Sequence, residues 1–380
     1  MAYRLHLFPG LTLLLISFAI QYQLTRWLFQ SRPWPRAFQA FVLAINAAVA
    51  GLSSIGYLLG FHRILRHLPV LFITWMEAAA LANCVGLVGL FVAVFLWRKV
   101  PPMQSHRRAF LRAGIAALVS APYAAAAFGI VDRNRFQLNE INLRIPNLPR
   151  DLDGLRIVQI TDIHMSPFLS EQEFARAVDM ANETRAHIGL VTGDLISRTG
   201  DPVDACLRQL SRLRADSAIL GCLGNHEVYA HIEDYVTIMG RRIGIDFLRD
   251  ASRQLRFGNS TINFAGVDYQ KFNEPYLVGT ERHVRPGMLN ILLSHNPDVF
   301  PKAAAMGFDL TISGHTHGGQ VNFEILHQNV NIARYYTPYV KGEYRRGNSA
   351  IYVSTGLGTI GLPIRAGAPA EVALIRLCAS

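Results

Sequence analysis

Apolar residues are distributed unevenly along the 380-residue chain, and the N-terminal third contains most of the long apolar stretches. Four of these stretches carry almost no charge, and each is about as long as the ~20 residues that a helix needs to cross the hydrocarbon core of a bilayer. The stretches lie at residues 5–25, 37–61, 68–97 and 113–131. We therefore predict that residues 1–131 form a membrane region of four transmembrane helices.

A different pattern begins near residue 155, where short β-branched runs alternate with helical patterns. The runs that predict strands are "RIVQIT", "IGLVT", "SAILGCL", "TINFAGV", "LNILLS", "FDLTIS", "AIYVST" and "EVALIRL". After the first run, Ser170 and Glu173 have the spacing of a capping box at the start of an amphipathic helix. The alternation predicts an α/β fold with a sizeable buried sheet for residues 155–380. The polar segment 132–154 is expected to be a stalk that leads into an edge strand.

The formal charge of +10 depends almost entirely on the N-terminal region. Residues 1–132 hold 11 Lys and Arg but only two acidic residues, which leaves 26 basic and 25 acidic residues for the rest of the chain. A nearly neutral C-terminal domain gives no electrostatic reason to expect a nucleic-acid partner. The cysteines lack the spacing of a zinc finger, so we interpret them as buried, unreactive thiols. They are Cys84, Cys206, Cys222 and Cys378.

Polar residues with metal-binding groups follow five of the predicted strands directly. In open α/β sheets, ligands bind at the carboxyl ends of the strands, so these residues are expected to converge at one edge. Each of them alone is typical of an ordinary turn or loop. Together they would form a cluster of desolvated polar groups that needs a stabilising partner, which a metal ion would supply. They are Asp162, His164, Asp194, Asn225, His226, His295, His315 and His317.

The composition of this cluster indicates which metals it would bind. Oxygen and nitrogen donors without a thiolate suit Mn²⁺, Fe²⁺ or Zn²⁺. The number of candidate ligands exceeds the three or four expected for one ion, which favours two divalent ions that share a carboxylate. His315 and His317 are two residues apart in "SGHTHGGQ" and would point the same way in an extended segment. Two neighbouring ions could therefore each take one imidazole.

The order of these motifs, D-x-H, GD, GNHE, an isolated His and GHTH, resembles that of the calcineurin-like metallophosphoesterase superfamily. The longer motifs "SGHTHGGQ" and "GLGTIGLPIR" resemble those of its bacterial membrane-associated branch. The resemblance covers residues 155–380 and implies a four-layer β-sandwich flanked by helices. The chain departs from the pattern at Ala370, where a second proline is expected before Glu371.

The resemblance also implies a role for each candidate. Asp162, His164 and His317 would bind the first ion. Asn225, His295 and His315 would bind the second, and Asp194 would bridge the two. A metal-bound hydroxide would be the nucleophile, and His226 would protonate the leaving oxygen or stabilise its charge. Two interpretations of Arg365 stay open, a contact with a substrate phosphate or a surface ion pair.

These expectations predict a membrane-anchored hydrolase of phosphodiester, phosphomonoester or pyrophosphate bonds. The membrane anchor makes lipid-linked phosphates candidate substrates, and the resemblance includes enzymes that cleave the pyrophosphate of UDP-diacylglucosamine. The alternative is a membrane sensor or binding protein with an inactive metal domain, which should lack one of the ligands. A transporter is disfavoured because Glu77 is the only acidic residue within the predicted spans. The sequence makes no prediction of the oligomeric state.

The distribution of arginine and lysine predicts the orientation in the membrane. Loops 26–36 and 98–112 carry eight basic residues, whereas the N-terminus and loop 62–67 carry three, which places the first set in the cytoplasm. The four arginines of the stalk would lie on the same side as the N-terminus and loop 62–67. With them included, the count is eight basic residues against seven. The segment "HRRAFLRAGIAALVSAPYAAAA" also resembles a twin-arginine export signal, although its arginines could be juxtamembrane charges only. We predict a catalytic domain outside the bacterial cytoplasmic membrane, tethered by the fourth span.

Overall fold

The computed structural model describes residues 7–59, 70–99, 114, 128–272, 274–325, 328–361 and 363–380. The chain divides into two compact units. One comprises Met1–Ile130 with Gly361–Pro363, and the other comprises Val131–Ile360 with Ile364–Ser380.

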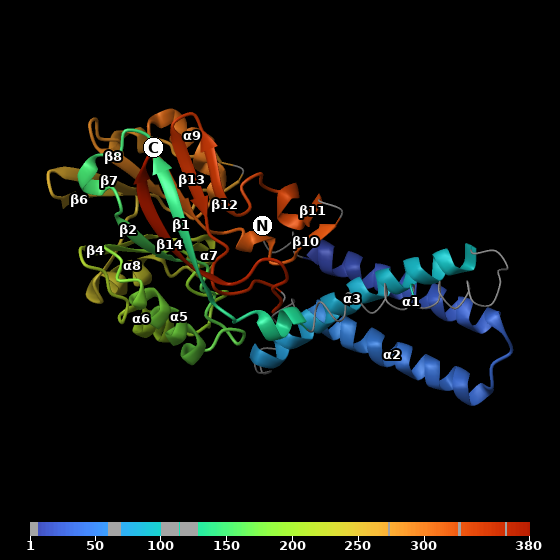
Figure 1. The fold of residues 1–380 in the computed structure, drawn as a ribbon. Helices are drawn as coiled ribbons and strands as arrows, with labels where there is room; N and C mark the ends of the chain where they lie inside the picture. Colours follow the sequence, from blue (N-terminus) through green and yellow to red (C-terminus); the bar gives the residue numbers. More distant parts are fainter. Residues whose placement is uncertain are drawn as a thin grey trace. The chain divides into compact units, whose positions relative to one another are not determined.

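The described part of the N-terminal unit is built from three long helices, α1 (Leu7–Ser31), α2 (Arg36–Leu59) and α3 (Val70–Lys99) (Figure 1). Aromatic packing joins α1 to α3, since the rings of Trp27 and Phe91 stack with their centroids 5.3 Å apart. Three of the four predicted apolar spans coincide with these helices, and most of the fourth lies outside the described residues. Among the residues that are described, no helix combines the length and apolar character needed to cross a membrane. The predicted transmembrane helices are thus not confirmed.

The second unit contains two mixed six-stranded sheets. The strand order of the first sheet is β1-β14-β2-β3-β4-β5. Its strands are parallel to their neighbours except at β14 and β2, which are antiparallel. The strands are β1 (Gln137–Ile145), β14 (Glu371–Ala379), β2 (Arg156–Ile160), β3 (Ile188–Thr192), β4 (Ala218–Cys222) and β5 (Ile245–Phe247).

The second sheet has the order β12-β13-β9-β8-β7-β6. Its four inner strands are parallel, and an antiparallel strand closes each edge. The strands are β12 (Gly342–Arg346), β13 (Ser349–Val353), β9 (Leu310–Ser313), β8 (Leu289–Leu293), β7 (Ser260–Gly266) and β6 (Ala251–Phe257). A separate antiparallel hairpin consists of β10 (Asn322–Ile325) and β11 (Gln328–Asn331).

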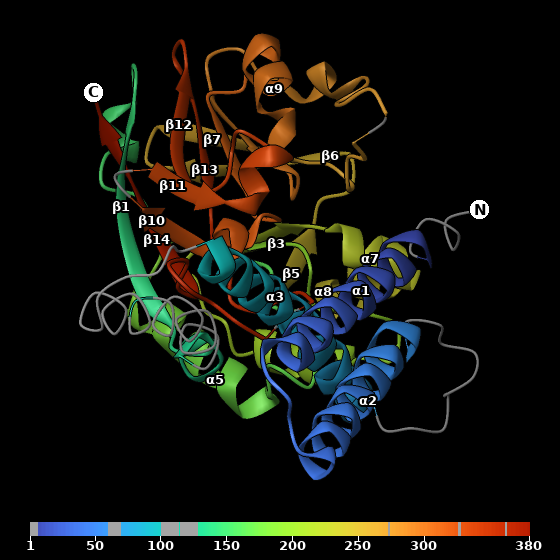
Figure 2. The ribbon, with the colours of Figure 1, turned by 90° about the vertical axis from the view of Figure 1, so that its right-hand side faces the viewer.

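The main hydrophobic core lies between the two sheets. Fully buried residues of both sheets contribute to it, among them Ile157 and Leu190 from the first and Phe264 and Ile312 from the second. Helices cover the outer faces, so the unit has four layers, and in two views α5 and α9 lie on opposite sides of the sheets (Figure 1 and Figure 2). The helices are α5 (Glu171–Glu183), α6 (Val203–Leu210), α7 (Asn225–Ala230), α8 (Glu233–Arg242) and α9 (Phe300–Met306). This arrangement confirms the predicted α/β sandwich of two sheets flanked by helices.

Local sequence signals account for several element ends. The predicted capping box begins α5, since Ser170 Oγ accepts the backbone N–H of Glu173 at 3.2 Å and Glu173 Oε2 accepts that of Ser170 at 2.8 Å. A glycine in the left-handed region, Gly307 with φ +94°, ends α9. Short 3₁₀ turns connect the remaining elements. They are η2 (Arg150–Leu152), η3 (Thr280–His283), η4 (Pro297–Val299), η5 (His317–Gly319) and η6 (Ile332–Tyr335).

Candidate metal centre

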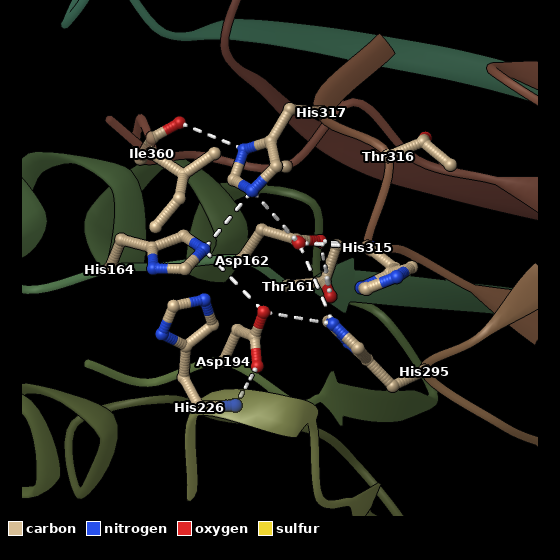
Figure 3. A network of polar contacts seen from close by, with 12 residues as sticks. Thr161, Asp162, His164, Asp194, His226, His295, His315, Thr316, His317 and Ile360 are labelled. Atoms are coloured by element: carbon tan, nitrogen blue, oxygen red, sulfur yellow. Dashed lines mark hydrogen bonds and ion pairs between the residues drawn. The ribbon is translucent and has the colours of Figure 1, made fainter. Parts of the chain in front are cut away.

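The structure brings seven of the eight candidate residues together at one edge of the two sheets (Figure 3). The eighth, Asn225, directly precedes His226, whose backbone N–H donates to Asp194 Oδ1. Each of the eight follows the carboxyl end of a strand, as the alternation of strands and helices predicts. Asp162 and His164 follow β2, Asp194 follows β3, Asn225 and His226 begin α7 after β4, His295 follows β8, and His315 and His317 follow β9. Both sheets therefore contribute to the centre.

Asp162, His164 and His317 form the first group of candidate ligands. One ligand atom of each lies within 4.8 Å of the others. The Nε2 atoms of His164 and His317 are 3.1 Å apart, and His317 Nε2 is 3.4 Å from Asp162 Oδ1. Asp162 is completely buried, and the two imidazoles are exposed by less than 5%. Two imidazole nitrogens and a carboxylate oxygen thus face one another without access to bulk water.

Asp194, His295 and His315 form the second group, with the same 4.8 Å limit between ligand atoms. His295 Nε2 lies 2.9 Å from Asp194 Oδ2, and the rings of His295 and His315 have centroids 5.0 Å apart. Asp194 also belongs to a third group with His164 and His226, since its Oδ2 is 3.5 Å from His164 Nε2. Asp194 therefore lies between the two halves of the centre, where a bridging carboxylate would have to be.

Backbone carbonyl groups fix the orientation of three imidazoles. His295 Nδ1 is 2.7 Å from the carbonyl oxygen of Thr192, and His317 Nδ1 is 3.3 Å from that of Gly358. His226 Nδ1 likewise contacts the carbonyl oxygen of Ser197. A carbonyl oxygen can only accept a hydrogen bond, so Nδ1 is the protonated nitrogen in these rings. In a neutral ring this leaves the Nε2 lone pair free to bind a metal ion.

Burial and mutual repulsion make the centre deficient in positive charge. Burial lowers the pKa of both His164 and His315 to about 3, and it raises the pKa of Asp162 to about 6. His295 behaves in the opposite way, because the nearby carboxylates of Asp194 and Asp162 outweigh burial and raise its pKa to about 10. In the metal-free protein, the proton on His295 thus offsets the negative charge of the buried carboxylates. A bound metal cation would supply the same positive charge.

One buried ligand atom, Asn225 Oδ1, has no hydrogen-bond partner among the described residues. His295 Nε2 has only the carboxylate of Asp194 beside it, at 2.9 Å. Unpaired buried polar atoms are costly and call for an explanation. The carboxylate, amide and imidazole donors suit Mn²⁺, Fe²⁺ or Zn²⁺. The residues present therefore fit divalent metal ions.

The backbone at the centre is strained in a way that is typical of functional sites. Five of the candidate ligands have a positive φ that non-glycine residues rarely adopt, at a cost of about 1–3 kcal/mol each. They are Asp162 (φ +50°), His164 (+47°), Asp194 (+56°), His315 (+76°) and His317 (+53°). Sharp turns after each strand aim these side chains at one point.

Glycines allow the ligand loops to approach one another. A Cβ atom on Gly224 would lie 2.1 Å from Asp194 Oδ1, and one on Gly314 would lie 2.2 Å from Asp162 Oδ2. Both separations are far shorter than any real contact. The glycines that precede Asn225 and His315 are therefore required for the carboxylates to reach their places.

Glu227 is a buried residue of the centre for which the motifs predict no role. Its carboxylate accepts three backbone N–H groups, those of Asp194 at 2.9 Å, Leu195 at 2.7 Å and Gly224 at 2.8 Å. The loops after β3 and β4 are thereby held together at the bridging carboxylate. Its place within "GNHE" is the only sequence signal for this role.

Two tyrosines border the centre and were also missed. The ring of Tyr269 lies 5.6 Å from that of His315 and 6.3 Å from that of His295, measured between centroids. Tyr229 packs edge-on against His226 at 5.7 Å and is 62% exposed. Tyr269 follows β7 by a few residues, at the same kind of strand end as the ligands. Because tyrosine was not among the expected ligand types, the pattern of strand ends did not identify it.

One sequence-based interpretation of Arg365, the surface ion pair, is wrong, because the residue is only 2% exposed. Its guanidinium donates to backbone carbonyl groups such as those of Thr355, Gly358 and Ala368. The contact with a substrate phosphate stays a prediction. Burial lowers the pKa of Arg365 to about 10, which still leaves it protonated at neutral pH.

Part of the chain is similar in sequence to known phosphoesterases. Residues 155–319 match the family model described as calcineurin-like phosphoesterase. The chain is 28% identical over 281 residues to the uncharacterized metallophosphoesterase YkuE of Bacillus subtilis, which covers 72% of this chain and 98% of that protein. It is also 28% identical over 244 residues to the uncharacterized metallophosphoesterase Cj0846 of Campylobacter jejuni, covering 63% of each. Among solved structures, phosphopantetheinyl hydrolase from Mycobacterium tuberculosis aligns with a TM-score of 0.34 at 13% identity, over 50% of this chain and 95% of that one.

The sandwich of two mixed sheets and the buried His/Asp cluster define a metal-dependent phosphoesterase, which confirms the predicted enzyme class. Within that class, residues 155–319, which carry the motifs, are similar to the calcineurin-like phosphoesterases.

Proposed function

We propose that the protein is a dinuclear phosphoesterase that hydrolyses phosphodiester, phosphomonoester or pyrophosphate bonds. One observation carries the proposal, namely that Asp194 belongs both to a ligand group with His164 and to a second with His295 and His315. A shared carboxylate is what two ions about 4 Å apart require. When bound, such a pair would neutralise charge on the phosphate oxygens and make water available as a nucleophile near neutral pH.

The residues of the centre divide into two ligand sets around Asp194. Asp162, His164 and His317 would hold the first ion. Asn225, His295 and His315 would hold the second, and the unpaired Oδ1 of Asn225 supports this assignment. The backbone carbonyls that accept from Nδ1 of His295 and His317 keep both rings in the tautomer that can bind metal.

His226 is proposed to deliver the proton to the leaving oxygen. Its ring is half-buried at the centre, 4.7 Å from that of His164, and its backbone N–H donates to Asp194 Oδ1 at 2.9 Å. Because Nδ1 donates to the carbonyl of Ser197, Nε2 is the nitrogen available to exchange a proton with substrate. The same position would let it stabilise negative charge on that oxygen.

Apolar and aromatic side chains near the centre support a substrate with an apolar group next to its phosphate, such as a lipid-linked phosphate. Tyr269 and Tyr229 border the ligands, and Ile360, which is 38% exposed, lies beside His164 and His317 (Figure 3). Phe272, in the loop that carries Tyr269, is 71% exposed. An apolar substrate group would cover surface that is otherwise left in water.

We further propose, from the sequence, that the protein is attached to the bacterial cytoplasmic membrane and that its catalytic domain lies outside it. The proposal is based on segment 113–131, the distribution of arginine and lysine in the loops, and the twin arginines at 107 and 108. The name of a zebrafish relative, "Transmembrane protein with metallophosphoesterase domain", supports a membrane association. That protein is 26% identical over 267 residues, covering 66% of this chain and 60% of its own.

The purified chain, loaded in turn with Mn²⁺, Fe²⁺ and Zn²⁺, should be assayed on monoester, diester, pyrophosphate and lipid-linked substrates. We expect turnover that chelation abolishes and metal restores. Binding of a phosphorylated ligand without turnover under every metal would contradict the hydrolase and favour the sensor or binding protein with an inactive metal domain.

A further inference from the structure

Arg365 is a buried cation that the proposed hydrolysis does not use. It is 2% exposed, and within the described part of the chain each of its hydrogen bonds is donated to a backbone carbonyl oxygen. The carboxylates of Asp162 and Glu371 act on it only through their charge. Burying a guanidinium without a hydrogen-bonded anionic partner is expensive, so the position needs a reason beyond packing. The acceptors are the carbonyl groups of Thr355, Gly356, Gly358, Ala368 and Pro369.

The guanidinium joins two stretches of chain, 355–358 and 368–369. Nη2 donates to the carbonyl of Thr355 at 2.8 Å, and Nε donates to that of Gly358 at 3.2 Å. Nη1 donates to the carbonyl of Ala368 at 3.0 Å. A planar fork with five N–H donors can satisfy several carbonyls in fixed directions, which a lysine cannot do. Arg365 therefore sets the conformation of stretch 355–358.

Stretch 355–358 is bonded directly to the ligands of the first ion. The backbone N–H of Gly358 donates to the carbonyl of Asp162 at 2.7 Å. The carbonyl of Gly358, which accepts from Arg365, also accepts from Nδ1 of His317 at 3.3 Å. One residue, Gly358, thus connects the guanidinium to two ligands of the same ion.

Close packing transmits the position of this stretch to the ligands. A Cβ atom on Gly356 would lie 2.5 Å from Cβ of Asp162, and one on Gly358 would lie 2.2 Å from the carbonyl oxygen of Ile163. A Cβ atom on Gly318, next to His317, would lie 2.7 Å from Cγ2 of Thr355. A small displacement of stretch 355–358 must therefore move the ligands or open a gap beside them.

Two ligands of the second ion are supported differently. His295 is oriented by the carbonyl of Thr192, and the loop that leads to Asn225 is tied to Asp194 through Glu227. None of these hydrogen bonds involves stretch 355–358. Loss of the guanidinium should consequently weaken the binding of the two ions unequally.

We propose that Arg365 is a positioning residue for the first metal ion, acting through stretch 355–358 on Asp162 and His317. In this role its donors are taken up by backbone carbonyl groups, and it acts on the ion only through these two ligands. The proposal rests on the dinuclear function proposed above, and it specifies how that centre is held in place.

The full chain with Arg365→Gln or Arg365→Lys should be freed of metal and titrated with Mn²⁺, with bound Mn²⁺ counted and its electron paramagnetic resonance recorded. We expect one ion to bind as in the unsubstituted chain and the other to bind about 10- to 100-fold more weakly, the usual effect of losing a residue that orients a ligand. The signal of a coupled pair should give way to that of isolated Mn²⁺. Lysine should not restore the pair, because its ammonium cannot reach the same set of carbonyls.

Double variants identify the affected ion. Adding Arg365→Gln to His317→Ala should cause little further loss of metal affinity, because both changes weaken the binding of the first ion. Adding Arg365→Gln to Asn225→Ala should weaken the binding of the ion that remains. Arg345→Gln is a control, since Arg345 also donates to a backbone carbonyl, that of Arg144, but is well exposed and remote in sequence from the ligands.

Wild-type affinity for both ions in the two Arg365 variants would overturn the proposal. Equal weakening of both ions with a lowered melting temperature of the metal-free protein, or failure of both variants to fold, would also overturn it, since Arg365 would then support the fold in general. An unsubstituted chain that binds a single ion contradicts the dinuclear function separately. In that case the proposal about Arg365 fails unless Arg365→Gln and His317→Ala each weaken the binding of that single ion.

Discussion

His226 and the metal ligands lie within one cluster, yet substitution should separate their roles. His226→Ala removes a proton donor but leaves both ligand sets intact, so we expect the metal content to stay close to normal. The rate should fall by the ~10² to 10⁴ that is typical of losing a general acid. Steady-state kinetics and metal analysis of the same preparation would measure both quantities.

The leaving group provides the control for this prediction. The leaving group of a nitrophenyl ester needs little protonation. Its hydrolysis rate should therefore fall much less in His226→Ala than that of an alkyl ester. Equal losses for the two esters, or a loss of metal from His226→Ala, would mean that His226 binds or positions a metal ion instead.

Single residues show where sequence reasoning succeeds and where it stops. The clustering of seven candidate residues could be predicted because each is close to a strand end, and parallel strands bring their ends to one edge. Glu227 acts through backbone N–H groups, which no motif spacing reveals. The role of Arg365 depends on how the chain folds back over the strand ends, and its partners are carbonyl groups that every residue possesses.

At the level of elements, the loop that follows β7 brings the aromatic ring of Tyr269 to the ligands. Gln270 holds it in place, since its Oε1 accepts the N–H of Leu277 at 2.8 Å and its carbonyl accepts from Asn296 Nδ2 at 2.7 Å. Tyr269 is therefore presented to His315 by an anchored loop. This loop is expected to influence substrate binding more than chemistry.

Tyr269→Ala should raise KM about two- to tenfold for substrates with an apolar or aromatic group beside the phosphate, the range that a lost aromatic contact supports. The value of kcat should change little. Tyr235→Ala is the control, because Tyr235 lies on α8 and bonds to Asp204. An unchanged KM for Tyr269→Ala, or an equal rise for both variants, would count against a binding role for this loop.

Buried strands could be predicted from sequence more readily than exposed ones. All eight predicted runs overlap strands of the two sheets, because a strand covered on both faces reads as a continuous apolar run. The outer strands β6 and β12 were missed, since most of their residues are half-buried or exposed and their sequences are polar. Pairing with a neighbouring strand holds them in the sheet, and such pairing is not visible in a local pattern.

At the scale of the whole molecule, the membrane topology stays a prediction. A reporter enzyme that is active only in the periplasm, fused after Ser380, should be active if the catalytic domain lies outside the cytoplasm. The reason is the excess of basic residues in loops 26–36 and 98–112. A cytoplasm-specific fluorescent reporter at the same junction should stay dark, and the reverse pair of results would invert the predicted orientation.

The central claim is that two ions share Asp194 and together perform the hydrolysis, and a joint titration of metal content and activity tests it most directly. Metal-free protein should gain activity as the bound metal rises from one to two ions per chain. Asp194→Asn removes the charge that holds two cations close together, so it should bind fewer than two ions and lose at least ~10²-fold in rate. Full activity at one ion per chain, or an Asp194→Asn variant with two bound ions and near-normal turnover, would contradict the account.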